Sequence, residues 1–180
     1  MQTHLVVGFD PGVRFAGWAI VSRELSFVSG GLLKVPGVVD RRKIKGDLAL
    51  EYMLQEIHES ELCSLPVGLL AVEGQHLSRK HLKPMDIVRV GWVSGAMAGA
   101  CRARVTKVAN PGDWTGGVAK EVSQHRALYR AGESWESVAA KAGCTVAQAS
   151  EVISALGIGQ WAWKQAELSP ELRAAAGLES

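Results

Sequence analysis

The most informative stretch of the chain reads Leu5-Val6-Val7-Gly8-Phe9-Asp10-Pro11-Gly12. Its first five residues form an apolar run of the kind that makes a short buried strand. Asp10-Pro11-Gly12 supplies the turn residues that end such a strand. Two more strand-like runs follow closely, at Phe15–Val21 and Leu25–Leu33. Because only short turns separate the three runs, we expect an antiparallel meander.

The rest of the chain alternates helical and strand-like patterns. In order, we expect a helix capped by Asp47, a strand at Val67–Val72, a helix from Pro84 to about Arg102, a strand at Val105–Ala109, and helices between about residues 117 and 163 with breaks at Gly132 and Gly143. A run that is apolar throughout, as Val67–Val72 is, indicates a strand buried on both faces. This order predicts an α/β fold, in which helices cover a mixed sheet made of a three-strand meander plus two parallel strands.

Length and composition narrow the class of protein. The chain has 180 residues, of which 47% are hydrophobic and 21% charged, and a net charge of +2. We expect one domain over residues 1–165 and a loosely ordered tail at 166–180. The longest uncharged stretch is about half a membrane span, and no signal peptide is recognisable. Three scattered cysteines fit a reducing compartment. We therefore expect a cytoplasmic protein with no membrane partner, no disulfide framework and no zinc site.

Two acidic residues stand where a catalytic site is expected. Asp10 and Glu73 each end an apolar strand, and a glycine follows each of them within two residues. The carboxyl ends of neighbouring parallel strands form the crevice where open α/β sheets bind ligands. Two carboxylates close together in such a crevice repel each other, and a divalent cation relieves that repulsion. Ligation by oxygen alone favours Mg²⁺ or Mn²⁺.

These motifs resemble those of a known family. Gly8-Phe9-Asp10-Pro11-Gly12, followed by Gly17-Trp18-Ala19-Ile20, looks like the opening of the RuvC family of Holliday-junction resolvases, and Ala71-Val72-Glu73 resembles that family's second acidic strand. The order of elements matches from about residue 4 to 163. The resemblance implies an RNase H-like fold, a homodimer, and metal-dependent nicking of four-way DNA junctions.

The resemblance also implies acidic residues on the last long helix. Glu151 takes the position of the principal acid, as Glu where the family has Asp, and Gln148 takes the auxiliary position without a charge. A spacing of three residues places both on one helical face, so Gln148 is expected to contact a substrate phosphate or a bound water. We expect the longer Glu151 side chain to keep its helix slightly farther from the sheet.

The mechanism implied by the resemblance uses two Mg²⁺ or Mn²⁺ ions for each active site. Asp10 would bridge both ions, Glu73 would hold one and Glu151 the other. The expected products are symmetric nicks with 5′-phosphate and 3′-hydroxyl ends. Lys120 stands where the family often has a lysine near the scissile phosphate, and there it could stabilise the transition state.

Several other residues are candidates for DNA binding or dimerisation. The candidate DNA-binding residues are the basic Arg41, Arg42, Lys43, Arg79, Lys80 and Lys83, together with Trp114, which either stacks on bases or covers the sheet edge. Phosphates need such positive charge. Gly91, Gly95 and Gly99 recur every four residues in one predicted helix. Each costs about 1 kcal/mol relative to alanine, and a close approach of either the sheet or a second subunit would compensate for that cost.

Two alternative functions remain from the sequence. Residues 135–148 resemble a helix-turn-helix, in which case Glu151 belongs to a recognition helix and the protein binds DNA without cleaving it. Alternatively, the chain is an RNase H-like nuclease for RNA–DNA hybrids or other branched DNA. A nucleotide-binding kinase-like fold would need two lobes, and the chain is too short for them.

Overall fold

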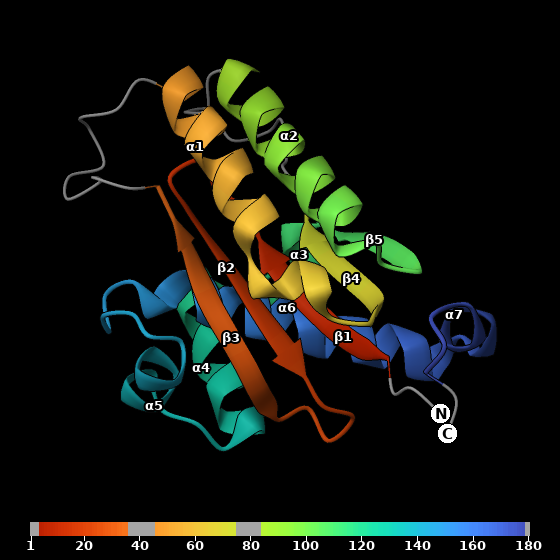
Figure 1. Cartoon of the computed structure of the whole chain (residues 1–180). Helices are drawn as coiled ribbons and strands as arrows, with labels where there is room; N and C mark the ends of the chain where they lie inside the picture. Colours follow the sequence, from red (N-terminus) through yellow and green to blue (C-terminus); the bar gives the residue numbers. More distant parts are fainter. Residues whose placement is uncertain (1–3, 36–45, 75–83, 179–180) are drawn as a thin grey trace.

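The computed structural model describes residues 4–35, 46–74 and 84–178, and Figure 1 shows the arrangement of their elements. The strands are β1 (Leu5–Asp10), β2 (Phe15–Val21), β3 (Phe27–Lys34), β4 (Val67–Glu73) and β5 (Val105–Ala109). The α-helices are α1 (Gly46–Glu59), α2 (Pro84–Cys101), α3 (Pro111–Thr115), α4 (Lys120–Ala131), α5 (Trp135–Lys141), α6 (Ala149–Leu168) and α7 (Pro170–Ala175), and a short 3-10 helix spans Glu61–Ser64.

The five strands form one mixed sheet in the order β3-β2-β1-β4-β5. β1 pairs antiparallel with β2, and β2 pairs antiparallel with β3, so the predicted meander is confirmed. β4 runs parallel to β1 and β5 runs parallel to β4. The carboxyl ends of β1, β4 and β5 therefore meet at one edge of the sheet.

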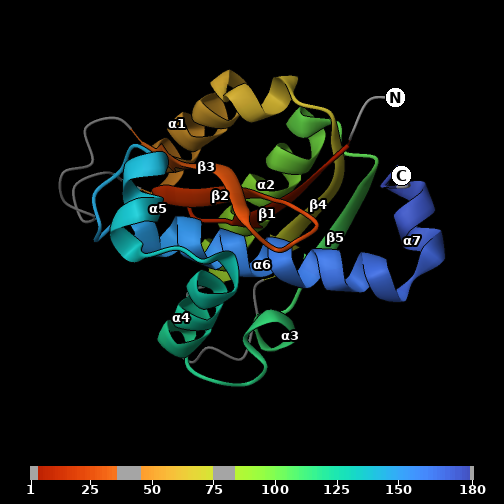
Figure 2. The same cartoon turned by 90° about the horizontal axis from the view of Figure 1, so that it is seen from below.

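Helices cover both faces of the sheet, as Figure 2 shows from below. α1 and α2 lie on one face, and α6 lies on the other, with α5 beside it against β3 and α4 beyond it. Along β1, Val6 packs in the core on the α6 side and Val7 packs in the core under α1 and α2. This alternation follows from the two-residue period of a strand. It also directs Asp10, four residues after Val6, toward α6.

Glycines let α6 lie directly on the sheet. A Cβ atom at Gly8 would come within 1.9 Å of the Ala155 carbonyl oxygen, and one at Gly17 within 2.2 Å of the carbonyl group of Glu151. A larger side chain at either position would push the helix away. The expectation that Glu151 holds its helix off the sheet is therefore wrong, because the backbone of the helix touches β2 at that residue.

Two expectations about helix ends differ from the structure. Asp47 lies within the first turn of α1, where its carboxylate accepts hydrogen bonds from Arg89 of α2 at 2.6 and 3.0 Å. Residues 166–178, expected as a loose tail, instead complete α6 and form α7. Ser169 caps α7 by accepting a hydrogen bond from the Leu172 N–H, and Leu178 is buried beyond it. The apolar residues of this segment therefore join the core on the α6 side.

Two further findings bear on the class of protein. Within residues 4–35, 46–74 and 84–178, no helix combines the length and the hydropathy that crossing a membrane requires. All three cysteines are free thiols in this structure.

Candidate active site

Asp10 and Glu73 lie side by side at the carboxyl edge of the sheet. Phe9 of β1 is paired with Val72 of β4, so the residue after each occupies the same level of the parallel pair. Both acids face the α6 side, since each is an even number of residues from strand neighbours in that core. Each is only 7% exposed. Two carboxyl groups from distant parts of the sequence are thus buried next to each other.

The surroundings of Glu73 favour its protonated form. Burial raises the pKa of Glu73, the negative charge of Asp10 raises it further, and together they bring it to about 7. The indole N–H of Trp114 in α3 opposes this rise by donating a hydrogen bond to Glu73 Oε1 at 3.0 Å. The two acids therefore do not both ionise readily near neutral pH unless a positive charge joins them.

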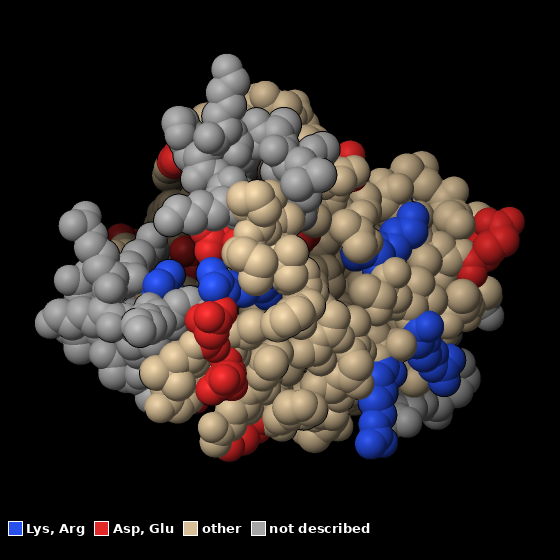
Figure 3. Space-filling model, turned by 90° about the horizontal axis from the view of Figure 1, so that it is seen from above, with Lys and Arg blue, Asp and Glu red and all other residues tan. Residues whose placement is uncertain are grey.

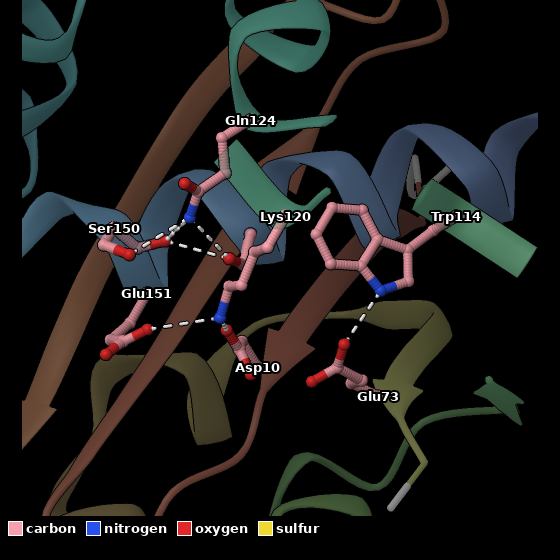
Figure 4. A network of polar contacts seen from close by, with 8 residues as sticks. Asp10, Glu73, Trp114, Lys120, Gln124, Ser150 and Glu151 are labelled. Atoms are coloured by element: carbon pink, nitrogen blue, oxygen red, sulfur yellow. Dashed lines mark hydrogen bonds and ion pairs between the residues drawn. The ribbon is translucent and has the colours of Figure 1, made fainter. Parts of the chain in front are cut away.

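Lys120, the first residue of α4, supplies one positive charge. Its Nζ lies 3.0 Å from Asp10 Oδ2 and 3.6 Å from Glu151 Oε2 (Figure 4). Burial disfavours the charge on Lys120, but the carboxylates of Asp10 and Glu151 outweigh burial and raise the pKa of the lysine. Asp10 thus lies between two partners, with Glu73 on one side and Lys120 with Glu151 on the other.

Glu151 reaches the site from the first turn of α6. Gly17 is paired with Asp10 across β1 and β2, and it is also the glycine that touches the Glu151 backbone. Gln124 of α4 fixes the two helices beside this contact, because its Nε2 donates to Ser150 O at 2.8 Å and lies 3.0 Å from Ser154 Oγ. The positions of Lys120 and Glu151 are therefore set by the same helix–helix contact.

The donor set fits a hard divalent cation in chemistry and charge. Three carboxylates and one ammonium leave an excess of negative charge, and two of the carboxylates are buried. Oxygen ligands of this kind suit Mg²⁺ or Mn²⁺. Among the described residues, however, no three His, Cys, Asp or Glu side chains are close enough to hold one ion together. Asp10 and Glu73 form the ready pair, while Glu151 is bound to Lys120.

Two predicted site residues have other partners. Gln148 precedes α6, and its Oε1 accepts hydrogen bonds from the backbone N–H and the hydroxyl of Thr145 at 3.2 and 3.1 Å. The Gln148 amide thus caps its own turn, and its expected contact with a substrate phosphate or a bound water stays a prediction. Trp114 is 8% exposed and packs against α6, so it covers the sheet edge and is not available to stack on bases.

The predicted basic residues Arg41, Arg42, Lys43, Arg79, Lys80 and Lys83 lie outside the described residues. Figure 3 views the molecule from above, where acidic and basic side chains lie side by side along a hollow that borders the grey segments.

The candidate interface glycines face away from the sheet. A Cβ atom at Gly91, Gly95 or Gly99 would meet no atom of the described residues within 4 Å, so the sheet does not account for them. The same helix exposes large apolar side chains, with Met85 52% and Trp92 59% accessible. α2 therefore presents a smooth and partly apolar outer face.

Sequence reasoning did not identify the Trp114–Glu73 hydrogen bond or the role of Gln124. A signal for the first was present, because Asn110 and Asp113 form a capping box that starts α3 directly after β5. Since β5 is parallel to β4, that start lies beside the end of β4 and brings the tryptophan to Glu73. No comparable signal existed for Gln124.

The helix-turn-helix interpretation conflicts with the position of α6. Val152, Ile153, Ala155 and Leu156 are all fully buried in the core against the sheet. A recognition helix must instead expose one face to the DNA major groove along its first turns. The first turns of α6 are instead buried against the sheet, and Glu151 contacts Lys120.

Comparisons with known structures identify the fold. The architecture is RNase H-like, and solved structures that share it include a bacterial RuvC and a yeast mitochondrial resolvase. RuvC of Thermus thermophilus matches with a TM-score of 0.60 and 19% identity over 97% of each chain, and with a TM-score of 0.58 and 17% identity, again over 97% of each chain, in its complex with a Holliday junction substrate. The yeast mitochondrial Holliday junction resolvase Ydc2 matches with a TM-score of 0.52 and 10% identity, over 99% of this chain and 87% of the other. No protein-family model and no curated protein sequence matches.

Proposed function

We propose that this protein is a metal-dependent endonuclease that resolves four-way DNA junctions. One observation carries the proposal: Asp10 and Glu73 share a buried position at the carboxyl edge of a RuvC-like sheet, and Lys120 and Glu151 border it. Buried acids that repel each other destabilise a fold, and a structural role alone does not require them. The solved structures with this fold are described as RuvC and as Holliday junction resolvases.

The three acids would hold the divalent ions. Asp10 would be a ligand common to the ions, because among the three acids it borders both Glu73 and the Lys120–Glu151 pair. Bound ions would supply Lewis-acid chemistry, neutralising a phosphodiester and activating water for in-line displacement that leaves 5′-phosphate and 3′-hydroxyl ends.

The protein's own groups would orient the reacting phosphate. Lys120 would donate its ammonium protons to a phosphate oxygen that approaches Asp10, exchanging an ion pair with a carboxylate for one with the substrate. Trp114 would hold Glu73 in place through the indole N–H, and its ring would close the bottom of the site to water. These groups together would fix the strand for hydrolysis.

A twofold dimer would bring two such sites to one junction. We infer that the dimer forms through the outer face of α2, where Gly91, Gly95 and Gly99 leave room for a helix of the second subunit. The exposed Trp92 supplies apolar area for the same contact. Sedimentation of Gly95→Leu tests this directly. A Cβ atom at Gly95 meets no described atom within 4 Å, so a well-folded monomer is expected, and an unchanged mass would exclude the interface.

Cleavage assays test the proposed activity. Labelled four-way junctions, Y-shaped DNA, linear duplex and an RNA–DNA hybrid are incubated with the protein, with Mg²⁺ or Mn²⁺ and with EDTA. Paired nicks in the four-way junction that require the metal support the proposal. Preferential cleavage of the hybrid would assign a different RNase H-like activity. Asp10→Asn is expected to abolish cleavage while it preserves junction binding, and cleavage surviving that change would contradict the proposed site.

A further inference from the structure

A second pocket lies under α6, outside the carboxylate site. It has a volume of about 180 Å³ and is bounded by α3, α4 and α6, which Figure 2 shows together. Three basic side chains line it: Arg126 and Arg130 from successive turns of α4, and Lys164 from α6. Trp161 of α6 lines the same pocket. Basic side chains from two helices thus line one pocket, and a tryptophan ring forms part of its wall.

Among the described residues, no ion pair balances the positive charge of this pocket. Within the described ranges, no carboxylate forms an ion pair with Arg126, Arg130 or Lys164. Asp113 also lines the pocket, but its Oδ2 already accepts hydrogen bonds from the backbone and side-chain nitrogens of Asn110. Like charges four residues apart on a helix destabilise it. An anion bound between them would remove that repulsion.

Trp114 joins this pocket to the carboxylate site. Its indole N–H binds Glu73, and its six-membered ring lies against Gly157 of α6, where a Cβ atom would come within 3.0 Å of the ring. Gly157 and Trp114 both line the pocket. One indole ring therefore lies between the pocket and Glu73, which places the three cations near the carboxylate site.

We propose that this pocket binds a backbone phosphate of the nucleic acid whose neighbouring segment lies at the acids. Arg126 and Arg130 would donate hydrogen bonds to the phosphate oxygens from their planar guanidinium groups, and Lys164 would add a point charge. The phosphate contact would position the strand and would be independent of base sequence. This inference rests on the proposed nuclease function for its ligand, although the phosphate chemistry of the pocket stands without it.

The test compares DNA binding by protein variants that all carry Asp10→Asn, so that cleavage cannot interfere. Affinity for a four-way junction and for a linear duplex is measured from 50 to 300 mM salt. The variant Arg126→Ala/Arg130→Ala/Lys164→Ala should weaken binding to both and reduce the slope of log affinity against log salt by about one, since one phosphate contact contributes about 0.9. Arg23→Ala, which removes an exposed charge that does not line the pocket, should leave the slope unchanged.

A direct measurement follows the indole N–H signals of Trp114 and Trp161 during titration with a short single-stranded oligonucleotide or with inorganic phosphate. Shifts with the oligonucleotide that the triple variant loses, and that Arg126→Lys/Arg130→Lys retains in part, support the proposal. Shifts with inorganic phosphate alone would assign a free anion and overturn the backbone assignment. A triple variant that matches Arg23→Ala in salt slope would also overturn it.

The outcomes separate this inference from the proposed function. Equal affinity for junction and duplex, with a salt slope that still depends on the three cations, would contradict junction resolution and support the pocket. Junction-selective binding with an unchanged salt slope in the triple variant would support junction resolution and contradict the phosphate pocket. A wild-type protein that binds no DNA would overturn both. Because all three side chains are exposed, the variants should melt at the wild-type temperature, and the melting curves check that they fold.

Discussion

Replacing Glu73 with Gln should change how the stability of the metal-free protein depends on pH. In the folded protein, burial and Asp10 raise the pKa of Glu73 from 4.5 to about 7. Since the unfolded chain gives up this proton at lower pH, the folded state loses stability as pH rises from about 4.5 to about 7, and the loss is constant above that. A shift of this size corresponds to up to about 3 kcal/mol. Glu73→Gln stays neutral throughout, and its amide oxygen can still accept from Trp114.

Urea denaturation in EDTA at pH 5 and pH 8 measures this effect. The wild-type protein should lose about 2 to 3 kcal/mol more unfolding free energy between the two pH values than Glu73→Gln does. Glu51→Gln, at an exposed position of α1, is the matched control and should follow the wild type. If Glu73→Gln and the wild type lose equal stability, Glu73 is not the strained acid that the buried pair requires.

Three further substitutions test single contacts of the site. Gly17→Ala should lower the unfolding free energy by about 1 to 3 kcal/mol, because its Cβ would strike the carbonyl group of Glu151. The control Gly112→Ala adds a Cβ atom with no described atom within 4 Å and should leave the unfolding free energy unchanged. Equal urea midpoints for the two variants would refute the tight helix contact. Lys120→Met should slow junction cleavage about 100-fold with little change in DNA affinity, and a rate within threefold of wild type would exclude Lys120 from the reaction. Trp114→Phe should destabilise the metal-free protein by about 1 to 3 kcal/mol at pH 8 and by less at pH 5, where Glu73 is protonated. An equal loss of unfolding free energy at both pH values would contradict the hydrogen bond to the ionised acid.

Most of the fold could be predicted because local patterns and the global fold agree. The apolar run Val67–Val72 identified the central strand, and the turn residues Asp10-Pro11-Gly12 identified the end of β1. The C-terminal segment was mispredicted for a physical reason. A loosely held tail was expected because chain ends are often poorly ordered, whereas docking of Ala176 and Leu178 into the core stabilises this segment, and that contact is not local in sequence.

The candidate site was predictable where strand ends define it and less so where side chains choose between partners. Parallel pairing of β1 and β4 brings Asp10 and Glu73 together whatever else the chain does. Helical spacing alone placed Gln148 beside Glu151, but a glutamine just before a helix can bond to its own turn, and Thr145 is within reach. The contact of Lys120 with two acids depends on how α4 packs against α6, which local patterns do not encode.

Calorimetric titration with Mn²⁺ detects whether acids from β1, β4 and α6 hold metal ions together, without any substrate. We expect two ions per chain for the wild-type protein, one for Glu151→Gln, and no comparable binding for Asp10→Asn, which removes the ligand common to both ions. Wild-type stoichiometry and affinity in Asp10→Asn would show that the paired acids do not form a metal site.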